Sequence, residues 1–220
     1  MVLVVIPAYN EEGKIGRVIR GLFEHGYREI VVINDGSTDN TAKEAEAAGA
    51  TVISHRLNRG QGAALETGNE YARRANAEMV VHFDGDGQFE ASDIGVALQM
   101  MKKNNAEVAL GSRFLDGRSN IPLLKRYFIL PVARCINFVF TGARLSDAHN
   151  GFRIMSKKAL EAIRLTQDGM AHNTEFVKKL RASKLSFIEV PVKVSYHEYG
   201  QGLGGGVKIL KELIISYFIG

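Results

Sequence analysis

Two aspartates stand one residue apart after a short apolar run in the segment VVHFDGDGQFE, residues 80–90. Asp84 and Asp86 bring two like charges close together, and such charges repel each other unless a positive group lies between them. Magnesium and manganese ions prefer oxygen ligands, and they often take one or two carboxylates together with the phosphates of a substrate. The spacing therefore predicts a divalent cation site that is shared with a diphosphate.

A calcium-binding EF-hand loop is the first alternative for this segment. Counted from Asp84, that loop needs a glycine at its sixth position and a glutamate at its twelfth. This sequence has Phe89 and Gly95 there, and an apolar strand rather than a helix precedes the aspartates. The EF-hand is therefore excluded, and an ordinary Asp-Gly turn remains as the simpler alternative. In the metal site, the glycines would let a diphosphate approach the backbone closely.

Asp35 ends a second apolar run, in NDGSTDNT (34–41). One of the next polar residues, Ser37, Thr38 or Asp39, is expected to cap the following helix. The Asp35 carboxylate would then keep acceptor capacity for the N–H groups of a nucleobase or the hydroxyls of a ribose.

Arg113 follows a third run, EVALGS (107–112). A guanidinium at a strand end can clamp phosphate oxygens through two parallel hydrogen bonds. A surface ion pair is the simpler alternative, and the sequence leaves both open.

The glycines of LNRGQGAAL (57–65) do not form a dinucleotide-binding fingerprint. Leu65 stands where the third glycine is needed, and the segment does not follow the first predicted strand. A nicotinamide or flavin enzyme is therefore not expected, although a glycine turn here could help to close a nucleotide pocket. The histidines show no metal-ligand spacing, and neither a nucleophile elbow nor a phosphate-binding P-loop is present.

Apolar strands and amphipathic helices alternate through the first half of the chain. Strands are expected at 2–6, 29–35, 51–54, 78–84 and 107–112, and helices at 15–23, 41–48, 61–75 and 92–103. Strands that are apolar throughout and alternate with helices indicate an α/β fold with a mostly parallel sheet flanked by helices. Ligands bind such sheets beyond the carboxyl ends of the strands, so the loops PAYNEE, NDGSTD and DGDGQ should converge there. Later segments add strands at 151–156 and 186–196 and helices near 157–164 and 173–183.

The segment from Gly117 to Ser146 contains no acidic residue but five basic ones, with aromatic residues interleaved. Such a pattern is typical of an amphipathic region at an anionic membrane surface, and a core helix pair with basic edges is the alternative. The basic residues are Arg118, Lys125, Arg126, Arg134 and Arg144. No run reaches the ~20 apolar residues of a membrane-spanning helix. Residues 201–220 form a glycine-rich stretch and a last amphipathic segment.

Composition sets broad limits on the class of protein. The chain has 220 residues, a formal net charge of +4 and one cysteine, Cys135, which excludes an internal disulfide and is expected to pack as a small apolar residue. The mild positive charge is compatible with an anionic substrate or a membrane surface. No aromatic-rich RNA-binding motif is present, so nucleic acid is not an expected partner.

Six motifs in this order resemble the inverting glycosyltransferases of family 2, nearest to the dolichyl-phosphate mannosyltransferases and their bacterial polyprenyl-phosphate relatives. The motifs are VVIPAYNEE, VVINDGSTDNT, NRGQGAAL, DGDGQ, GSR and DAHNGFR. The resemblance covers about residues 2–200 and implies a GT-A fold. It implies a glycosyltransferase domain over 1–200, with a nucleotide-sugar half (1–115) and an acceptor half (116–200), followed by the amphipathic segment 201–220.

The resemblance also implies roles for individual residues. Asp35 would contact the base, Asp84 would lie near the ribose and diphosphate, and Asp86 and Gln88 would hold the cation. Arg113 would face a phosphate, and Asp147 and Arg153 would fall on the acceptor side. The nucleoside pocket would be lined by Pro7, Ala8, Tyr9 and Glu11.

The implied reaction moves a sugar from a nucleotide diphospho-sugar to a lipid phosphate at the inner, cytoplasmic face of a membrane. Asp86, Arg113 and Asp147 are the expected catalytic residues. A phosphate acceptor is ionised near neutral pH and needs no strong base, whereas a sugar or polysaccharide hydroxyl would need one, and Asp147 is the candidate. A nucleotide-binding module without chemistry is a third alternative. One departure from the family pattern bears on the acceptor: VSYHEYGQGLGGGVK replaces the usual arginine and Ser-Lys pair.

Overall fold

A computed structural model describes residues 1–119, 142, 145–147 and 150–195. Their core is one seven-stranded sheet with the strand order β3-β2-β1-β4-β6-β5-β7. Neighbouring strands are parallel except where β6 pairs with β4 and β5. The predicted mostly parallel α/β sheet is therefore confirmed. None of the helices in these ranges is long and apolar enough to cross a membrane.

The helices and strands follow the predicted alternation closely. The strands are β1 (Val2–Ala8), β2 (Glu29–Asn34), β3 (Thr51–Ser54), β4 (Met79–His82), β5 (Val108–Ser112), β6 (Arg153–Ser156) and β7 (Phe187–Pro191). The helices are α1 (Ile15–Glu24), α2 (Thr41–Ala47), α3 (Gln61–Arg74), α4 (Ser92–Asn104), α6 (Lys157–Ala162) and α7 (His172–Ala182).

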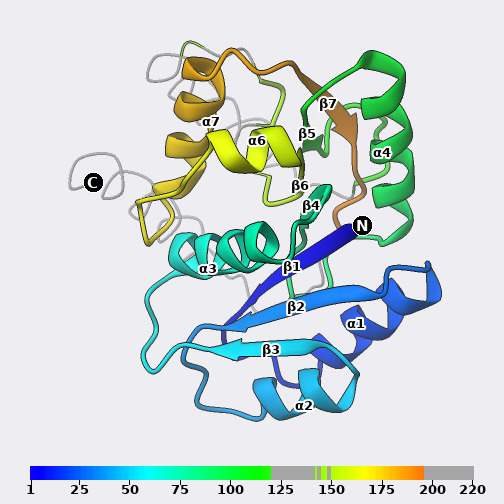
Figure 1. The fold of residues 1–220 in the computed structure, drawn as a ribbon. Coiled ribbons are helices and arrows are strands. Elements are labelled where there is room, and N and C mark those ends of the chain that lie inside the picture. The colour runs from blue at the N-terminus through cyan, green and yellow to red at the C-terminus, as the bar shows by residue number, and fades with distance from the viewer. Residues whose placement is uncertain (120–141, 143–144, 148–149, 196–220) are drawn as a thin grey trace, which may run out of the picture.

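Two helical layers cover the two faces of the sheet (Figure 1). Alternate residues of β1 show why: Leu3 and Val5 belong to a core formed with α3, α6 and α7, whereas Val4 and Ile6 belong to a second core formed with α1, α2 and α4. All four side chains are at most 2% exposed. A strand buried on both faces must be apolar at every position, as this one is.

The position of β6 is the feature that the sequence did not predict. This late strand inserts between β4 and β5, antiparallel to both, and its Arg153 pairs with His82 of β4 and Leu110 of β5. The amino end of β6 therefore lies at the same edge as the carboxyl ends of β4 and β5. As a result, Asp147 and residues 150–153 of the motif DAHNGFR reach the edge where the other polar loops lie.

Several predicted features lie outside the described residues. These are Cys135, most of the acid-free segment, and residues 196–220, which include all of the replacement motif VSYHEYGQGLGGGVK except Val194 and Ser195. Arg118 is described, and its guanidinium forms ion pairs with Asp116 at 2.5 Å and Asp93 at 2.9 Å.

Candidate active site

A pocket of about 410 Å³ opens at the carboxyl ends of β1, β2 and β4. It brings together the three loops that the sequence predicted to converge. Its lining includes seven predicted site residues, namely Pro7, Ala8, Tyr9, Glu11, Asp35, Asp84 and Asp86. Asn58, Gly60, Gln61, Ala64 and Gly85 complete the lining. Gln88, Arg113 and Asp147 do not line this pocket, and the roles of all ten predicted residues stay predictions.

The first two loops hold each other through side chains of the NDGSTDNT motif. The backbone N–H of Asn10 donates to Ser37 Oγ at 3.0 Å, and its side-chain Oδ1 accepts the N–H of Thr38 at 3.0 Å. The N–H of Glu11 donates to Thr41 Oγ1 at 2.8 Å. These polar residues thus fix the loop after β1. The prediction that Ser37, Thr38 or Asp39 caps α2 is wrong: the N-cap residue is Asn40, which makes no side-chain cap hydrogen bond, although Asp39 accepts the N–H of Thr41 at 3.0 Å.

Asp35 is buried, and its carboxylate is already engaged within the protein. Oδ1 lies 2.7 Å from His55 Nδ1 and accepts the N–H of Arg59 at 3.0 Å, and Oδ2 accepts the N–H of Gly60 at 2.7 Å. A carboxylate has about four lone-pair positions, so little of the expected acceptor capacity is left for a base. Sequence reasoning missed His55, which no motif marks.

Asp84 lies two residues beyond the end of β4, packed against the DAHNGFR segment. A Cβ on Gly151 would lie 2.5 Å from Asp84 Oδ2, so the carboxylate occupies space that only a glycine leaves. Gln61 Nε2 donates to Asp84 Oδ1 at 3.1 Å. Burial, reinforced by the charge of Asp86, raises the pKa of Asp84 to about 7, although the nearby arginines Arg153 and Arg113 oppose this shift.

Asp86 is the second carboxylate of the pair, and it contacts Gln88 in the same turn. Asp86 Oδ1 accepts the backbone N–H of Gln88 at 2.9 Å, which closes the turn. Within the ranges that the structure covers, no group of three His, Cys, Asp or Glu side chains could hold a metal. Two carboxylates beside a pocket nevertheless fit a cation whose remaining ligands come from phosphates and water.

The glycines of DGDGQ also have local reasons in packing and backbone conformation. A Cβ on Gly85 would lie 3.2 Å from Ile15 Cδ1 and 3.4 Å from the carbonyl oxygen of Pro7, so a side chain there would fit tightly against the protein. Gly87 has a φ of +79°, which favours glycine in the turn. The expected close approach of a diphosphate is therefore not needed to explain either residue.

The side chains of Arg113 and Asp147 form an ion pair. Both residues lie at the same edge of the sheet. Arg113 Nε lies 2.5 Å from Asp147 Oδ2, and the same oxygen accepts the side-chain N–H of Asn150 at 3.2 Å. The Asp147 side chain is 1% exposed. These contacts join β5 to the chain that leads into β6.

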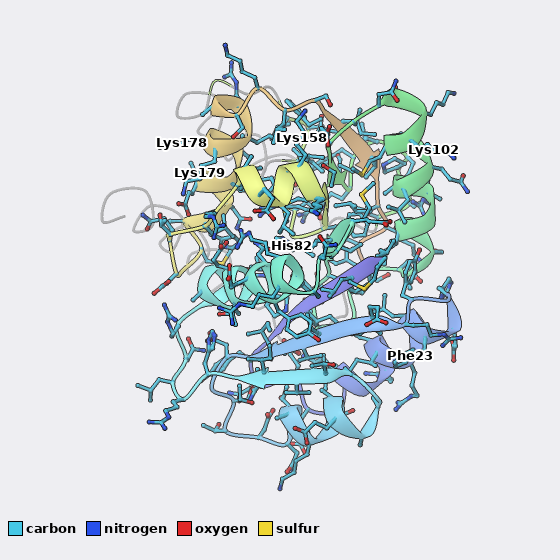
Figure 2. All side chains as sticks on the ribbon, viewed as in Figure 1. Phe23, His82, Lys102, Lys158, Lys178 and Lys179 are labelled. Atoms are coloured by element: carbon cyan, nitrogen blue, oxygen red, sulfur yellow. The ribbon has the colours of Figure 1, made fainter. Side chains whose placement is uncertain are left out.

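Arg153, which the resemblance implied to fall on the acceptor side, lies in the interior of the protein. Its side chain is buried, with the guanidinium carbon 4.5 Å from the ring centre of Phe176 and Nη2 donating to Asn173 Oδ1. Burial lowers its pKa to about 10, while the negative charge of Asp84 opposes that shift. His82, its partner across the sheet, lies in the interior beside α3 (Figure 2). The sequence could not reveal this burial, because it follows from the antiparallel insertion of β6.

The fold is that of an α/β protein with a pocket beyond the carboxyl ends of its strands, the place where such sheets commonly bind ligands. A solved structure of glucosyl-3-phosphoglycerate synthase from Mycobacterium tuberculosis, in complex with Mn²⁺, UDP and glucosyl-3-phosphoglycerate, superposes with a TM-score of 0.72. It is 19% identical and covers 99% of this chain and 78% of its own, so it shows a shared GT-A fold.

Residues 3–164 match the family described as Glycosyl transferase family 2, so the chain belongs to this family and is a glycosyltransferase. A UDP-N-acetylglucosamine–dolichyl-phosphate N-acetylglucosaminyltransferase of Methanococcus voltae is 32% identical over 230 residues, covering 95% of this chain and 91% of the relative. A dolichyl-phosphate β-glucosyltransferase of Trichomonas vaginalis is 28% identical over 234 residues, covering 96% and 71%.

Proposed function

We propose that this glycosyltransferase moves a sugar from a nucleotide diphospho-sugar to a polyprenyl phosphate of the dolichyl type, with inversion at the anomeric carbon. The observation that carries the proposal is the pocket in which Asp84 and Asp86 face the loops after β1 and β2. The names of the relatives from Methanococcus voltae and Trichomonas vaginalis support the acceptor class.

The donor would lie across the pocket with its nucleoside beside Tyr9 and Asp35 and its diphosphate toward the aspartates. Asp86 and Gln88 would hold Mg²⁺ or Mn²⁺, and the Mn²⁺ and UDP named for the mycobacterial synthase support this cofactor. A bound cation supplies Lewis-acid stabilisation of the negative charge on the leaving diphosphate. Gln61 and the backbone at Gly151 contact the Asp84 carboxylate, which would lie beside that group.

A phosphate acceptor fits the surroundings of Asp147 better than a hydroxyl does. A hydroxyl needs a base that can take its proton, whereas a phosphate monoester is already ionised near neutral pH. Asp147 is buried, and one of its oxygens is held by both Arg113 and Asn150. A base so enclosed would have to break these contacts, so transfer to a sugar or polysaccharide hydroxyl is the second candidate.

The proposed acceptor requires contact with a membrane surface, at its cytoplasmic face. The acid-free, basic sequence from Gly117 to Ser146 supports peripheral attachment. Arg118 is engaged in ion pairs with Asp93 and Asp116, so the other basic residues of the segment would have to supply the attraction. Co-sedimentation with anionic vesicles at low salt tests this attachment.

Supplying the two classes of acceptor separately tests the proposed reaction. The purified protein is given radiolabelled UDP- and GDP-sugars with Mn²⁺, and either polyprenyl phosphate in detergent or a panel of free sugars and oligosaccharides. We expect label in the lipid fraction only, with inverted anomeric configuration. Label in the hydroxyl acceptors alone would establish the second candidate instead.

A further inference from the structure

The side chain of His55, at the end of β3, connects the pocket residue Asp35 to helix α3. His55 directly follows this strand, and its side chain is only 10% exposed. Nδ1 lies 2.7 Å from Asp35 Oδ1, and Nε2 lies 2.9 Å from Thr67 Oγ1 on α3. The proposed reaction gives His55 no part, because it does not line the pocket.

The contacts assign a direction to the bond between His55 and Asp35. An ionised carboxylate can only accept hydrogen bonds, so the proton between them belongs to His55 Nδ1. When Nδ1 carries the single hydrogen of the ring, Nε2 accepts the hydrogen of the Thr67 hydroxyl, whose oxygen also lies 3.0 Å from the carbonyl oxygen of Ala63. The ring is thus held at both nitrogens, with its Nδ1–H aimed at one oxygen of Asp35.

Asp35 in turn holds the turn that forms a wall of the pocket. Its two oxygens accept the N–H groups of Arg59 and Gly60, and Asn58 and Gly60 both line the pocket. Gly60 has a φ of +101°, and a Cβ there would lie 2.6 Å from the carbonyl oxygen of Asp168. The turn therefore needs both a glycine and an outside acceptor for its two N–H groups.

We propose that His55 is a positioning residue for the nucleotide pocket: its Nδ1–H orients the Asp35 carboxylate so that each oxygen receives a backbone N–H of the 58–60 turn. Without that hydrogen bond, Asp35 can rotate, and the wall formed by Asn58 and Gly60 loses its support. The identity of the ligand rests on the proposed function, but the support of the turn does not.

Three substitutions separate the two nitrogens of the ring. His55→Asn keeps an N–H donor near the place of Nδ1, His55→Gln places its donor near Nε2, and His55→Phe keeps the ring volume without a donor. Thr67→Val is the matched control, since it removes the hydroxyl that contacts Nε2 and the carbonyl oxygen of Ala63 but removes no contact to Asp35.

Amide hydrogen exchange, followed by NMR, measures how well the hydrogen bonds of the 58–60 turn are protected. It needs no ligand. We expect the amides of Arg59 and Gly60 to exchange slowly in the native protein, in His55→Asn and in Thr67→Val. They should exchange at least about tenfold faster in His55→Gln and His55→Phe, because a hydrogen bond to a charged group is lost or weakened. If His55→Phe does not fold, the Asn and Gln pair still gives the comparison.

Calorimetry measures the affinity of the protein for UDP and for GDP, each in the presence of Mn²⁺. Whichever nucleotide the native protein binds should bind about tenfold more weakly to His55→Gln than to His55→Asn. In transfer assays, KM for the donor should rise while kcat changes little.

Equal exchange and equal affinity in the Asn and Gln variants would overturn the proposal. So would losses in Thr67→Val as large as those in His55→Gln, because they would reveal a general packing role. If the native protein binds neither nucleotide, the proposed function fails at its donor, and amide exchange alone then decides the role of His55.

Discussion

The two aspartates of DGDGQ differ in what surrounds them. Asp84 is enclosed by Gln61 and Gly151, with the guanidinium of Arg153 near enough to influence its charge. Asp86 closes its own turn through the N–H of Gln88. This difference supports the division of roles, with Asp84 on the nucleotide side and Asp86 at the cation.

The titration of Asp84 should appear in the stability of the protein without ligand. Burial and the charge of Asp86 raise its pKa from 3.8 to about 7, so the folded state favours the protonated form. The contribution of Asp84 to the free energy of unfolding is fully present below about pH 4, and it is lost as the pH rises through about 7. Asp84→Asn cannot titrate, so it should gain stability relative to the native protein between about pH 4 and about pH 8.

Thermal denaturation of both proteins across that pH range measures the difference. Groups elsewhere titrate alike in both, so their contributions cancel in the comparison. A difference in Tm that stays constant with pH would contradict the raised pKa.

At the scale of elements, β6 decides which loops meet. Gly151 is the residue through which its amino end contacts the site, and Gly151→Ala would press a methyl group against Asp84 Oδ2. Since a small misplacement of a group in the site is costly, we expect transfer to fall by about tenfold or more. Gly95→Ala on α4 is the control, because the nearest atom to a Cβ there is Tyr27 Oη at 3.8 Å. If Gly151→Ala and Gly95→Ala both match the native protein in steady-state kinetics, the contact between Gly151 and Asp84 has no role in transfer.

The start of α3 depends on a second glycine contact. A Cβ on Gly62 would overlap the carbonyl oxygen of Gln167, so Gly62→Ala must displace the segment before α7. We expect a loss of about 2 kcal/mol or more in the free energy of unfolding. Gly21→Ala on α1, where nothing lies within 4 Å, should instead gain about 0.5–1 kcal/mol. Urea denaturation measures both, and a neutral Gly62→Ala would show that the segment moves at no cost.

The sequence predicted most elements because apolar periodicity and turn residues are local signals. It also placed Asp35, Asp84 and Asp86 together, since parallel strands end at one edge. It could not predict the insertion of β6, because strand pairing across some 70 residues leaves no local trace. The buried place of Arg153 and the ion pair between Arg113 and Asp147 both follow from that insertion.

At the scale of the whole molecule, the two halves expected from the sequence share a single sheet. β6 and β7 of the later half flank β5 of the earlier half, so the pocket and the DAHNGFR segment are held by one continuous framework. Helices on both faces leave the carboxyl edge of the central strands for the ligand (Figure 1).

Cation-assisted transfer from a sugar nucleotide would depend on Asp86. The most direct measurement compares sugar transfer to polyprenyl phosphate by the native protein and by Asp86→Ala over a titration of Mn²⁺. We expect the native protein to require Mn²⁺, and the variant to lose at least about 100-fold in rate without recovery at high Mn²⁺, since charge stabilisation at the leaving group supplies several kcal/mol. Transfer by Asp86→Ala at the native rate, with an unchanged dependence on Mn²⁺, would contradict the account.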